Sequence, residues 1–321
     1  MDNGMIDRAQ GCLFGQVAGD SLGGLVEFSH GTQIEDRYPN GVRELEDGGT
    51  WHNMAGQCTD DSEMALLLAR SLVAKGGYDR EAVKADYVHW MSHDAFDHGG
   101  TLSAALLYRE LNPGSQSNGC LMRISPVGVW GAKKGDDEVA KVAREDASIT
   151  HVNETALLVC ELYAVGVAHA VRGESAQQVY DCIAARAKAK NAPKVVLDRI
   201  AKAKTERPES YGGVASDSNG YNVTGWIMTA FHNALYQLLN AKNVEEGIVD
   251  TIARYGDTDT NAAIAGALLG AVHGAKGVPE RWRKTILACK PGPDMKHRTR
   301  HPQPEKYWPC DVDVLAIKLL N

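Results

Sequence analysis

The sequence predicts an all-α fold. From residue 137 onward, apolar residues recur at helical spacing in segment after segment, whereas the alternation of Val, Ile and Thr that is typical of strands is nearly absent. No repeat, low-complexity tract or clear linker interrupts the 321 residues, so we expect a single domain spanning 1–321. The helices predicted in this part of the chain are 137–147, 153–172, 175–190, 193–205, 222–242, 244–255, 259–275, 279–289 and 311–320.

The first predicted helix, 8–24, carries a glycine at every fourth position. This spacing lines one helical face with residues that lack side chains, so another helix can approach that face closely. Asp20 lies within this run, where an unpaired charge would be costly, and we expect it to be hydrogen-bonded, to cap a helix or to lie near a metal. Glu27 follows shortly after the helix and is a candidate acid or base.

Residues 29–57 lack periodicity and are expected to form a long loop, and loops of this length are often functional. Thr59 then precedes a helix that is expected to stop at Gly76, and this helix has Asp60 and Asp61 in its first turn. Complementarity to the helix dipole would by itself explain one acidic helix start.

A second acidic turn lies about 200 residues further along the chain, at Asp257, Asp259 and Thr260, and it opens the apolar helix 259–275. Two such turns that converge would offer carboxylate and hydroxyl oxygens without cysteine. This set of ligands favours hard divalent cations, Mg²⁺ or Mn²⁺, with Ca²⁺ as an alternative.

A third polar stretch follows a helix predicted at 81–92, and its side chains offer further ligands or a base. They are His93, Asp94, Asp97 and His98, of which Asp97 is favoured because it lies beside glycines.

Two glycine turns are candidate anion sites. Gly99 and Gly100 precede a helix that Thr101 is expected to cap, and Asn118 and Gly119 form a tight turn that enters another helix. Backbone amides at a helix start favour an anion, so two such turns would suit a diphosphate.

Composition excludes several classes of protein. The formal net charge of −7 argues against a surface for nucleic acid or anionic membrane, because such surfaces need a clustered basic face. No membrane span or signal peptide is indicated, so we expect a cytoplasmic protein. The seven cysteines are widely spaced and are expected to be reduced, and no CxxC or Cys/His spacing suggests a zinc site.

These residues leave three functions open. One is an all-α metal-dependent phosphohydrolase of the His…His-Asp…Asp type, since His93 precedes Asp94 in an all-α chain. The second is a glycosidic hydrolase that uses two metals to hold a sugar diol, and the third is a non-catalytic binding or structural protein.

A series of motifs, spread over nearly the whole chain, narrows this choice. The motifs are Gly15-x-x-x-Gly19-Asp20, Thr59-Asp60-Asp61-Ser62, Phe96-Asp97-x-Gly99, Ser117-Asn118-Gly119-x-x-Met122-Arg123, Thr150-His151, Gly220-Tyr221 and Gly256-Asp257-Thr258-Asp259-Thr260. These motifs and their order along the chain resemble those of the ADP-ribosylglycohydrolase family, which includes the dinitrogenase-reductase-activating glycohydrolases. The resemblance implies a compact, orthogonal multi-helix bundle with a binuclear Mg²⁺ or Mn²⁺ centre.

The resemblance also assigns roles to individual residues. It implies that Glu27 lies beside the metals and that Asp97 works near the ribose, with either residue as the base. The implied metal ligands are Thr59, Asp60, Asp61, Asp257, Asp259 and Thr260. The implied contacts to the diphosphate, distal ribose and nucleotide are Gly99, Gly100, Asn118, Gly119, Met122, His151 and Tyr221. The loops 29–57 and 206–220 match no motif and are expected to set specificity.

The implied activity is cleavage of the N- or O-glycosidic bond between ADP-ribose and a modified acceptor. Arginine-linked substrates on protein are favoured, while serine-linked ADP-ribose, modified nucleic-acid bases and small ADP-ribosyl compounds remain open. A crystallin-like structural relative or a non-catalytic ADP-ribose-binding protein is the alternative. It is disfavoured because both acidic clusters and Glu27 are intact. We expect a monomer with no membrane partner.

Overall fold

The all-α prediction is confirmed. The computed structural model describes residues 2–210 and 224–321, and within them it contains fifteen α-helices, five short 3-10 turns and no strand. The helices are α1 (Asn3–Gly23), α2 (Gly31–Arg37), α3 (Asp60–Lys75), α4 (Arg80–His93), α5 (Gly100–Leu107), α6 (Ser125–Trp130), α7 (Asp136–Ala147), α8 (Glu154–Arg172), α9 (Ala176–Ala189), α10 (Lys194–Lys202), α11 (Ile227–Asn240), α12 (Val244–Ile252), α13 (Thr258–His273), α14 (Glu280–Ala288) and α15 (Val312–Leu319).

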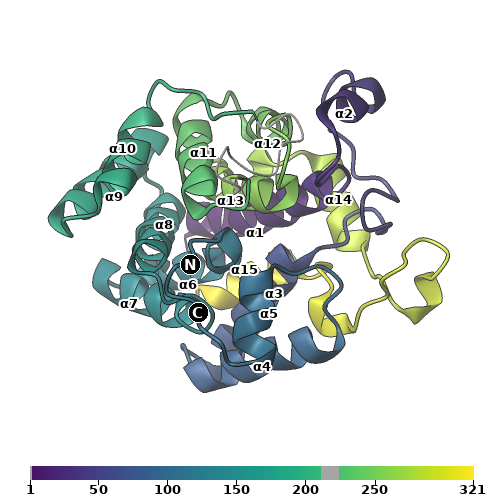
Figure 1. Cartoon of the computed structure of the whole chain (residues 1–321), viewed down its shortest axis with the longest axis horizontal. Helices are drawn as coiled ribbons and strands as arrows, with labels where there is room; N and C mark the ends of the chain where they lie inside the picture. Colours follow the sequence, from purple (N-terminus) through teal and green to yellow (C-terminus); the bar gives the residue numbers. More distant parts are fainter. Residues whose placement is uncertain (1, 211–223) are drawn as a thin grey trace.

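Helices α1 and α13 form the centre of the fold, and they pack against each other more extensively than any other pair (Figure 1). The glycine face predicted for the first helix is the face that meets α13. A Cβ atom at Gly15 would lie 2.1 Å from the carbonyl oxygen of Gly266, and one at Gly19 would lie 2.0 Å from that of Ala262. The two backbones therefore touch directly, with no room for a side chain between them.

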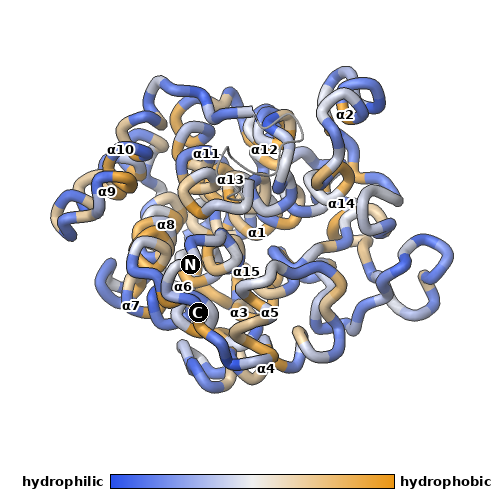
Figure 2. The backbone as a smooth tube through the Cα atoms, viewed as in Figure 1, coloured by the Kyte–Doolittle hydropathy of each residue, from blue (hydrophilic) through white to orange (hydrophobic). Residues whose placement is uncertain are grey.

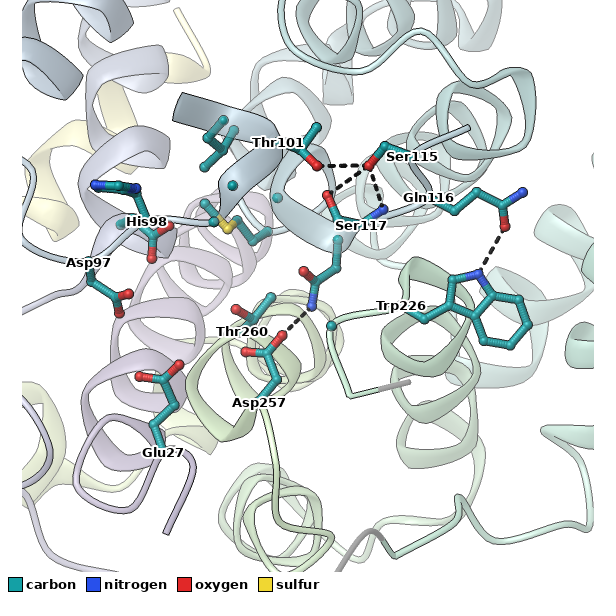
Figure 3. Close-up of a pocket in the computed structure, with 18 of the residues that line it drawn as sticks. Glu27, Asp97, His98, Thr101, Ser115, Gln116, Ser117, Trp226, Asp257 and Thr260 are labelled. Atoms are coloured by element: carbon teal, nitrogen blue, oxygen red, sulfur yellow. Dashed lines mark hydrogen bonds between the residues drawn. The ribbon is translucent and has the colours of Figure 1, made fainter. Parts of the chain in front are cut away.

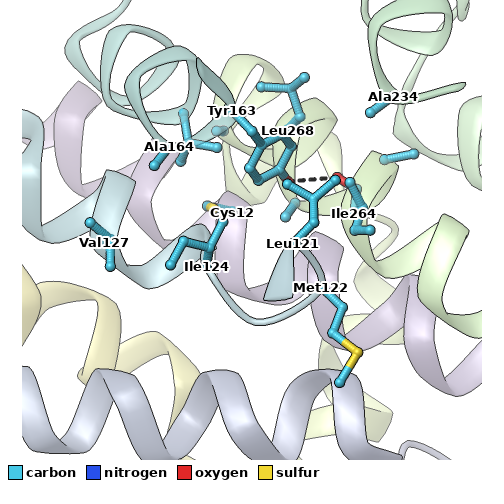
Figure 4. Packing of buried hydrophobic residues seen from close by; sticks show 14 of the residues in the cluster. Cys12, Leu121, Met122, Ile124, Val127, Tyr163, Ala164, Ala234, Ile264 and Leu268 are labelled. Carbon is cyan, nitrogen blue, oxygen red and sulfur yellow. Dashed lines mark hydrogen bonds between the residues drawn. The ribbon is translucent and has the colours of Figure 1, made fainter. Parts of the chain in front are cut away.

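Helix α8 is the one helix in the described part of the chain that is long and apolar enough to cross a membrane. Its apolar window is 89% buried inside the protein, as expected for a core helix. Apolar segments gather inside the molecule and polar ones lie at its edge (Figure 2). The Tyr163 hydroxyl of α8 donates to the carbonyl oxygen of Ile264 at 2.7 Å, which ties α8 to α13 (Figure 4).

The start of α3 is held by a carboxylate from α1. Asp20 accepts hydrogen bonds from the Thr59 amide at 3.0 Å, the Thr59 hydroxyl at 2.8 Å and the Ser62 amide at 3.0 Å. Asp20 thus caps α3, which is one of the roles expected for it. Thr59 occupies the N-cap position, but its own side chain makes no cap hydrogen bond. This contact fixes the first turn of α3 against α1.

The loop after α5 is fixed by a buried ion pair. The Arg123 guanidinium donates to the Asp146 carboxylate at 2.9 Å, and both side chains are fully buried. The same guanidinium also donates to the hydroxyl of Thr150 at 3.1 Å. Residues 118–123 and 146–151 are therefore held together.

Some predicted boundaries were wrong. The stretch expected to be a long loop, 29–57, contains α2, which has seven residues and starts with a capping box between His30 and Gln33. So short a helix has too few apolar positions to give a periodic signal. Helix α5 has Gly99, not Thr101, at its N-cap.

All seven cysteines are free thiols, as predicted.

Candidate active site

A cavity of about 670 Å³ opens where the ends of several helices meet (Figure 3). Its size is typical of small-molecule sites. No Lys or Arg is found among the described residues that line it. The lining residues are Glu27, Phe28, Asp60, Asp97, His98, Gly99, Gly100, Thr101, Leu102, Gly114, Ser115, Gln116, Ser117, Asn118, Gly119, Met122, Gly225, Trp226, Asp257 and Thr260.

The two acidic turns converge at this cavity. Asp60 from the start of α3 and Asp257 from the start of α13 both line it. Carboxylate oxygens of Glu27, Asp257 and Asp259 lie within 4.8 Å of one another, although the first residue is more than 200 positions from the others. The close contact between α1 and α13 makes this possible, since it brings the end of α1 to the start of α13.

Three buried carboxylate oxygens of the acidic residues around this cavity have no hydrogen-bond partner among the described residues. They are Oδ1 of Asp61, Oδ2 of Asp97 and Oδ2 of Asp259. A buried acceptor without a partner is costly, and a carboxylate more so. Unpaired, buried carboxylate oxygens in an acidic region fit hard divalent cations, which take oxygen ligands.

Burial and mutual repulsion raise the pKa values of the carboxyl groups around this cavity and so favour their neutral forms. The pKa of Asp60 is raised well above its ordinary value by burial and then by Asp97, and the pKa of Asp259 is raised by burial and then by Glu27. Burial, followed by the charge of Asp257, raises the pKa of Asp97 to about 7. Positive charge at the centre would favour the ionised forms, so the cluster is electrostatically suited to cations.

Glu27 is held by a residue that sequence analysis did not single out. The indole nitrogen of Trp51 donates to Oε2 of Glu27 at 2.8 Å, and the Thr50 hydroxyl donates to the Glu27 carbonyl oxygen at 2.9 Å. The Trp51 ring packs edge-on against Phe96 with ring centroids 6.0 Å apart. Burial, followed by the charges of Asp97 and Asp257, raises the pKa of Glu27 well above its ordinary value. In the sequence, the only indication that Trp51 has a function was its position in the loop 29–57, which was expected to set specificity.

The first glycine turn lies open to the cavity. Gly99 and Gly100 both line it, and a Cβ atom at either position would meet nothing within 4 Å. Gly100 begins α5, so the first amides of this helix lie at the cavity wall.

The second glycine turn differs from the expectation. Asn118 and Gly119 line the cavity, but they belong to a three-residue 3-10 turn, Asn118–Cys120, and not to the start of an α-helix. The Asn118 amide donates to the carbonyl oxygen of Gly225 at 3.0 Å, so it is not available to an anion. The Asn118 side chain donates to Oδ2 of Asp257 at 2.8 Å and therefore orients an acidic residue of the centre (Figure 3).

The remaining predicted contacts divide into three cases. Met122 lines the cavity. His151 does not line it, because it is fully buried with Nε2 2.7 Å from the Ser117 hydroxyl and Nδ1 2.9 Å from the Thr150 hydroxyl. Ser117 does line the cavity, so His151 can act on a ligand only through it. Tyr221 lies outside the described residues.

Polar residues from 115–117 and an indole form the other wall of the cavity, and sequence analysis gave none of them a role. The Trp226 indole nitrogen donates to Oε1 of Gln116 at 2.9 Å, and the Thr101 and Ser115 hydroxyls lie 2.8 Å apart (Figure 3). Ser117 belongs to one of the motifs, but no motif joins residues 115–117 to Trp226, which is about 110 residues further along the chain.

The His-Asp pair that suggested a phosphohydrolase lies elsewhere. His93 is exposed, and its Nδ1 is 2.9 Å from the carbonyl oxygen of His89. Asp94 accepts a hydrogen bond from the Tyr307 hydroxyl at 2.6 Å and so holds the C-terminal tail. Neither residue lines the cavity or belongs to a candidate metal group among the described residues. Among the described residues, His93 and Asp94 therefore do not form the metal site that a phosphohydrolase of this type needs.

Comparisons with known proteins agree with the motifs. A model of the ADP-ribosylglycohydrolase family matches residues 1–300. The chain is 27% identical over 301 residues to an ADP-ribosylarginine hydrolase of Pseudomonas putida (strain GB-1), covering 88% of this chain and 74% of that protein. It is 27% identical over 285 residues to an ADP-ribosyl-[dinitrogen reductase] glycohydrolase of Rhodospirillum rubrum, covering 86% of this chain and 89% of that protein.

A solved structure shares the fold. The chain matches an ADP-ribosylglycohydrolase-related protein complex with a TM-score of 0.77 at 23% identity, and the match covers 98% of this chain and 97% of the other.

Proposed function

The chain belongs to the ADP-ribosylglycohydrolase family, and we propose that it hydrolyses the glycosidic bond between ADP-ribose and a modified acceptor, namely arginine on a protein. One observation carries this proposal: two acidic helix starts and Glu27 meet at a cavity of about 670 Å³. A cavity of this size can accommodate a small-molecule ligand, and its acidic wall can act on a sugar at one end of that ligand.

The proposed metal centre holds two divalent cations, Mg²⁺ or Mn²⁺, on ligands from the two helix starts. When bound, such cations hold sugar hydroxyls and stabilise developing negative charge. The unpaired, buried oxygens of Asp61 and Asp259 support this assignment. The proposed ligands are Thr59, Asp60 and Asp61 from α3, and Asp257, Asp259 and Thr260 from α13.

Glu27 is the proposed base. Trp51 fixes one oxygen of its carboxylate at 2.8 Å, so the group is held in one orientation on the cavity wall. From there it would take a proton from the water that attacks the anomeric carbon. Asp97 lies on the same side of the cavity (Figure 3) and is the second candidate for this role. The surrounding carboxylates would stabilise the positive charge that develops on the sugar ring as the bond breaks.

The proposed diphosphate site is the start of α5. The amides of Leu102 and Ser103 donate to the carbonyl oxygen of Gly99, whereas those of Gly100 and Thr101 have no partner within the helix. The partial positive charge at this helix start favours an anion. Because no Lys or Arg lines the described part of the cavity, these backbone donors would carry most of the phosphate recognition.

Arginine is the proposed acceptor for two reasons. A relative with 27% identity is an ADP-ribosylarginine hydrolase. In addition, Glu27 and Asp97 form an acidic wall, and carboxylates bind guanidinium groups well. In the proposed reaction water adds to the anomeric carbon, the bond from that carbon to the guanidinium nitrogen breaks, and the guanidine leaves with a proton.

A panel of defined substrates tests the proposal. Peptides carrying ADP-ribose on arginine or serine, an ADP-ribosylated nucleobase and a small ADP-ribosyl compound are incubated with Mg²⁺, Mn²⁺ or a chelator, and free ADP-ribose is measured. We expect the arginine-linked substrate to react fastest and the chelator to stop release. Preference for another substrate would replace arginine as the acceptor. ADP-ribose binding without release from any substrate would establish the non-catalytic alternative.

A further inference from the structure

A second cluster of metal-ligating side chains lies away from the cavity, where α7 and α9 each pack against α8 (Figure 1). Asp136 is the first residue of α7, His169 lies in the last turn of α8, and Cys182 lies in α9. Their candidate ligand atoms are all within 4.8 Å of one another. None of the three lines the cavity, so the proposed function does not use them.

The contacts of the His169 ring pose a problem of proton count. Nδ1 lies 2.7 Å from Oε1 of Glu174, and a carboxylate only accepts, so Nδ1 carries a proton. Nε2 lies 2.9 Å from Oδ2 of Asp136 and 3.3 Å from Sγ of Cys182. A neutral ring has only one proton, so its Nε2 would turn a lone pair towards a second carboxylate. A second proton on the ring, or a cation shared among the three groups, would satisfy this arrangement.

The surroundings of the cluster match those of a metal site. A metal-binding histidine commonly donates its other N–H to a carboxylate, which fixes the ring, and Glu174 occupies this position. Arg172 donates to Oδ1 of Asp136 at 2.7 Å and to the carbonyl oxygen of Lys134 at 2.7 Å. Arg172 therefore holds the aspartate by one oxygen, and the other oxygen, Oδ2, faces His169.

We propose that Asp136, His169 and Cys182 form a zinc site with a fourth position open to water. One nitrogen, one sulfur and one oxygen ligand suit Zn²⁺, whereas Mg²⁺ prefers oxygen ligands alone. The His169 side chain is 15% exposed, so an ion can reach it from solvent. On tetrahedral zinc the ligand atoms would be roughly 3.4–3.7 Å apart, so the contact between Asp136 and His169 would open by several tenths of an ångström.

Binding would join the three helices and release protons. The Cys182 thiol gives up its proton on ligation, as does the second ring nitrogen of His169 where it is protonated, and both protons pass to solvent. Because the ligands come from three different helices, bound zinc would stabilise the packing of α7 and α9 on α8.

Zinc binding by the full-length protein tests this proposal. The titration uses a chromogenic zinc chelator as competitor and contains excess Mg²⁺ to fill the oxygen-only centre. We expect one equivalent of Zn²⁺ to bind, with Cys182→Ser lowering the affinity by at least about 100-fold. Glu174→Gln should lower it by roughly 10–100-fold, as is usual for a partner of a metal-binding histidine. Cys310→Ser is the matched control, because Cys310 is the other half-buried cysteine in the described residues and belongs to no candidate metal group there.

Cobalt gives an independent readout. Co²⁺ bound to a thiolate produces a charge-transfer band in the near ultraviolet, which we expect in the wild type and in Cys310→Ser but not in Cys182→Ser. If Cys182→Ser does not fold by circular dichroism, Glu174→Gln and the wild-type band decide the matter. Absence of the wild-type band, or equal zinc affinity in wild type and Glu174→Gln, would overturn the proposal. The cluster would then be an ion pair of a doubly protonated His169.

Discussion

Gly19 lies where α1 contacts the backbone of α13, and we predict that Gly19→Ala destabilises the protein by about 2 kcal/mol. The added Cβ would lie 2.0 Å from the carbonyl oxygen of Ala262 and 2.4 Å from its carbonyl carbon. Ordinary contact begins near 3.4 Å, so the oxygen contact is about 1.4 Å too short. Because the obstruction is backbone, it cannot rotate away as a side chain could, and the two helices must separate.

The magnitude follows from two opposing effects. Overfilling a packed core usually costs about 1–3 kcal/mol, and a rigid backbone obstacle places Gly19→Ala near the upper end of that range. Alanine in place of glycine inside a helix returns about 1 kcal/mol through its better helix propensity. The net loss of about 2 kcal/mol corresponds to a fall of roughly 3 °C in Tm for a chain of this length.

The separation should also disturb catalysis. Asp20, the next residue, caps α3, while Asp259 lies in the first turn of α13. A displacement of about 1 Å between groups that act together can lower turnover roughly 100-fold. We therefore expect Gly19→Ala to lose activity at temperatures where it is still fully folded.

Urea unfolding and turnover are measured for Gly19→Ala and for a matched control, Gly77→Ala. A Cβ at Gly77 would meet nothing within 4 Å, and its backbone conformation is open to alanine. The control should stay within about 0.5 kcal/mol of the wild type. If Gly19→Ala is as stable and as active as the control, the direct contact between α1 and α13 is refuted.

Four further changes address the candidate active site. Asp259→Asn should abolish Mn²⁺ binding and turnover, measured by calorimetry and ADP-ribose release; full activity in this mutant or in chelated protein would contradict the metal centre. Glu27→Gln should lower turnover about 10²–10⁴-fold while ADP-ribose still binds, and normal turnover would transfer the role of base to Asp97. Trp51→Phe removes the donor to Glu27 and should lower turnover about 10–100-fold. An unchanged rate of ADP-ribose release would show that this hydrogen bond does not matter for turnover. Gly100→Val places a side chain in open space at the cavity wall and should weaken ADP-ribose binding without unfolding the protein. Equal affinity of the wild type for ribose and ADP-ribose would argue against the diphosphate site.

Several features of the site could be predicted from the sequence because their causes are local. The acidic turns at Asp60 and Asp257 precede strongly apolar segments, and helix starts of this kind depend on neighbouring residues alone. The glycine spacing of the first helix predicted a face for close contact, and that face is the one that meets α13. The free cysteines also followed from their number and spacing.

The partners of individual side chains could not be predicted in this way. Asn118 was expected to hold a diphosphate, yet its side chain donates to Asp257, and His151 is buried behind Ser117. Trp51 had no motif, although it is the residue that orients Glu27. Each of these contacts joins segments that are tens to more than a hundred residues apart.

The sequence by itself determined the all-α class, the acidic helix starts and the family. The tertiary structure decided which side chains meet, because a contact between distant residues depends on how whole helices pack and in which direction they run. The cluster of Asp136, His169 and Cys182 shows the difference. No Cys/His spacing in the sequence suggested a zinc site, and only the packing of α7, α8 and α9 brings these three residues within 4.8 Å.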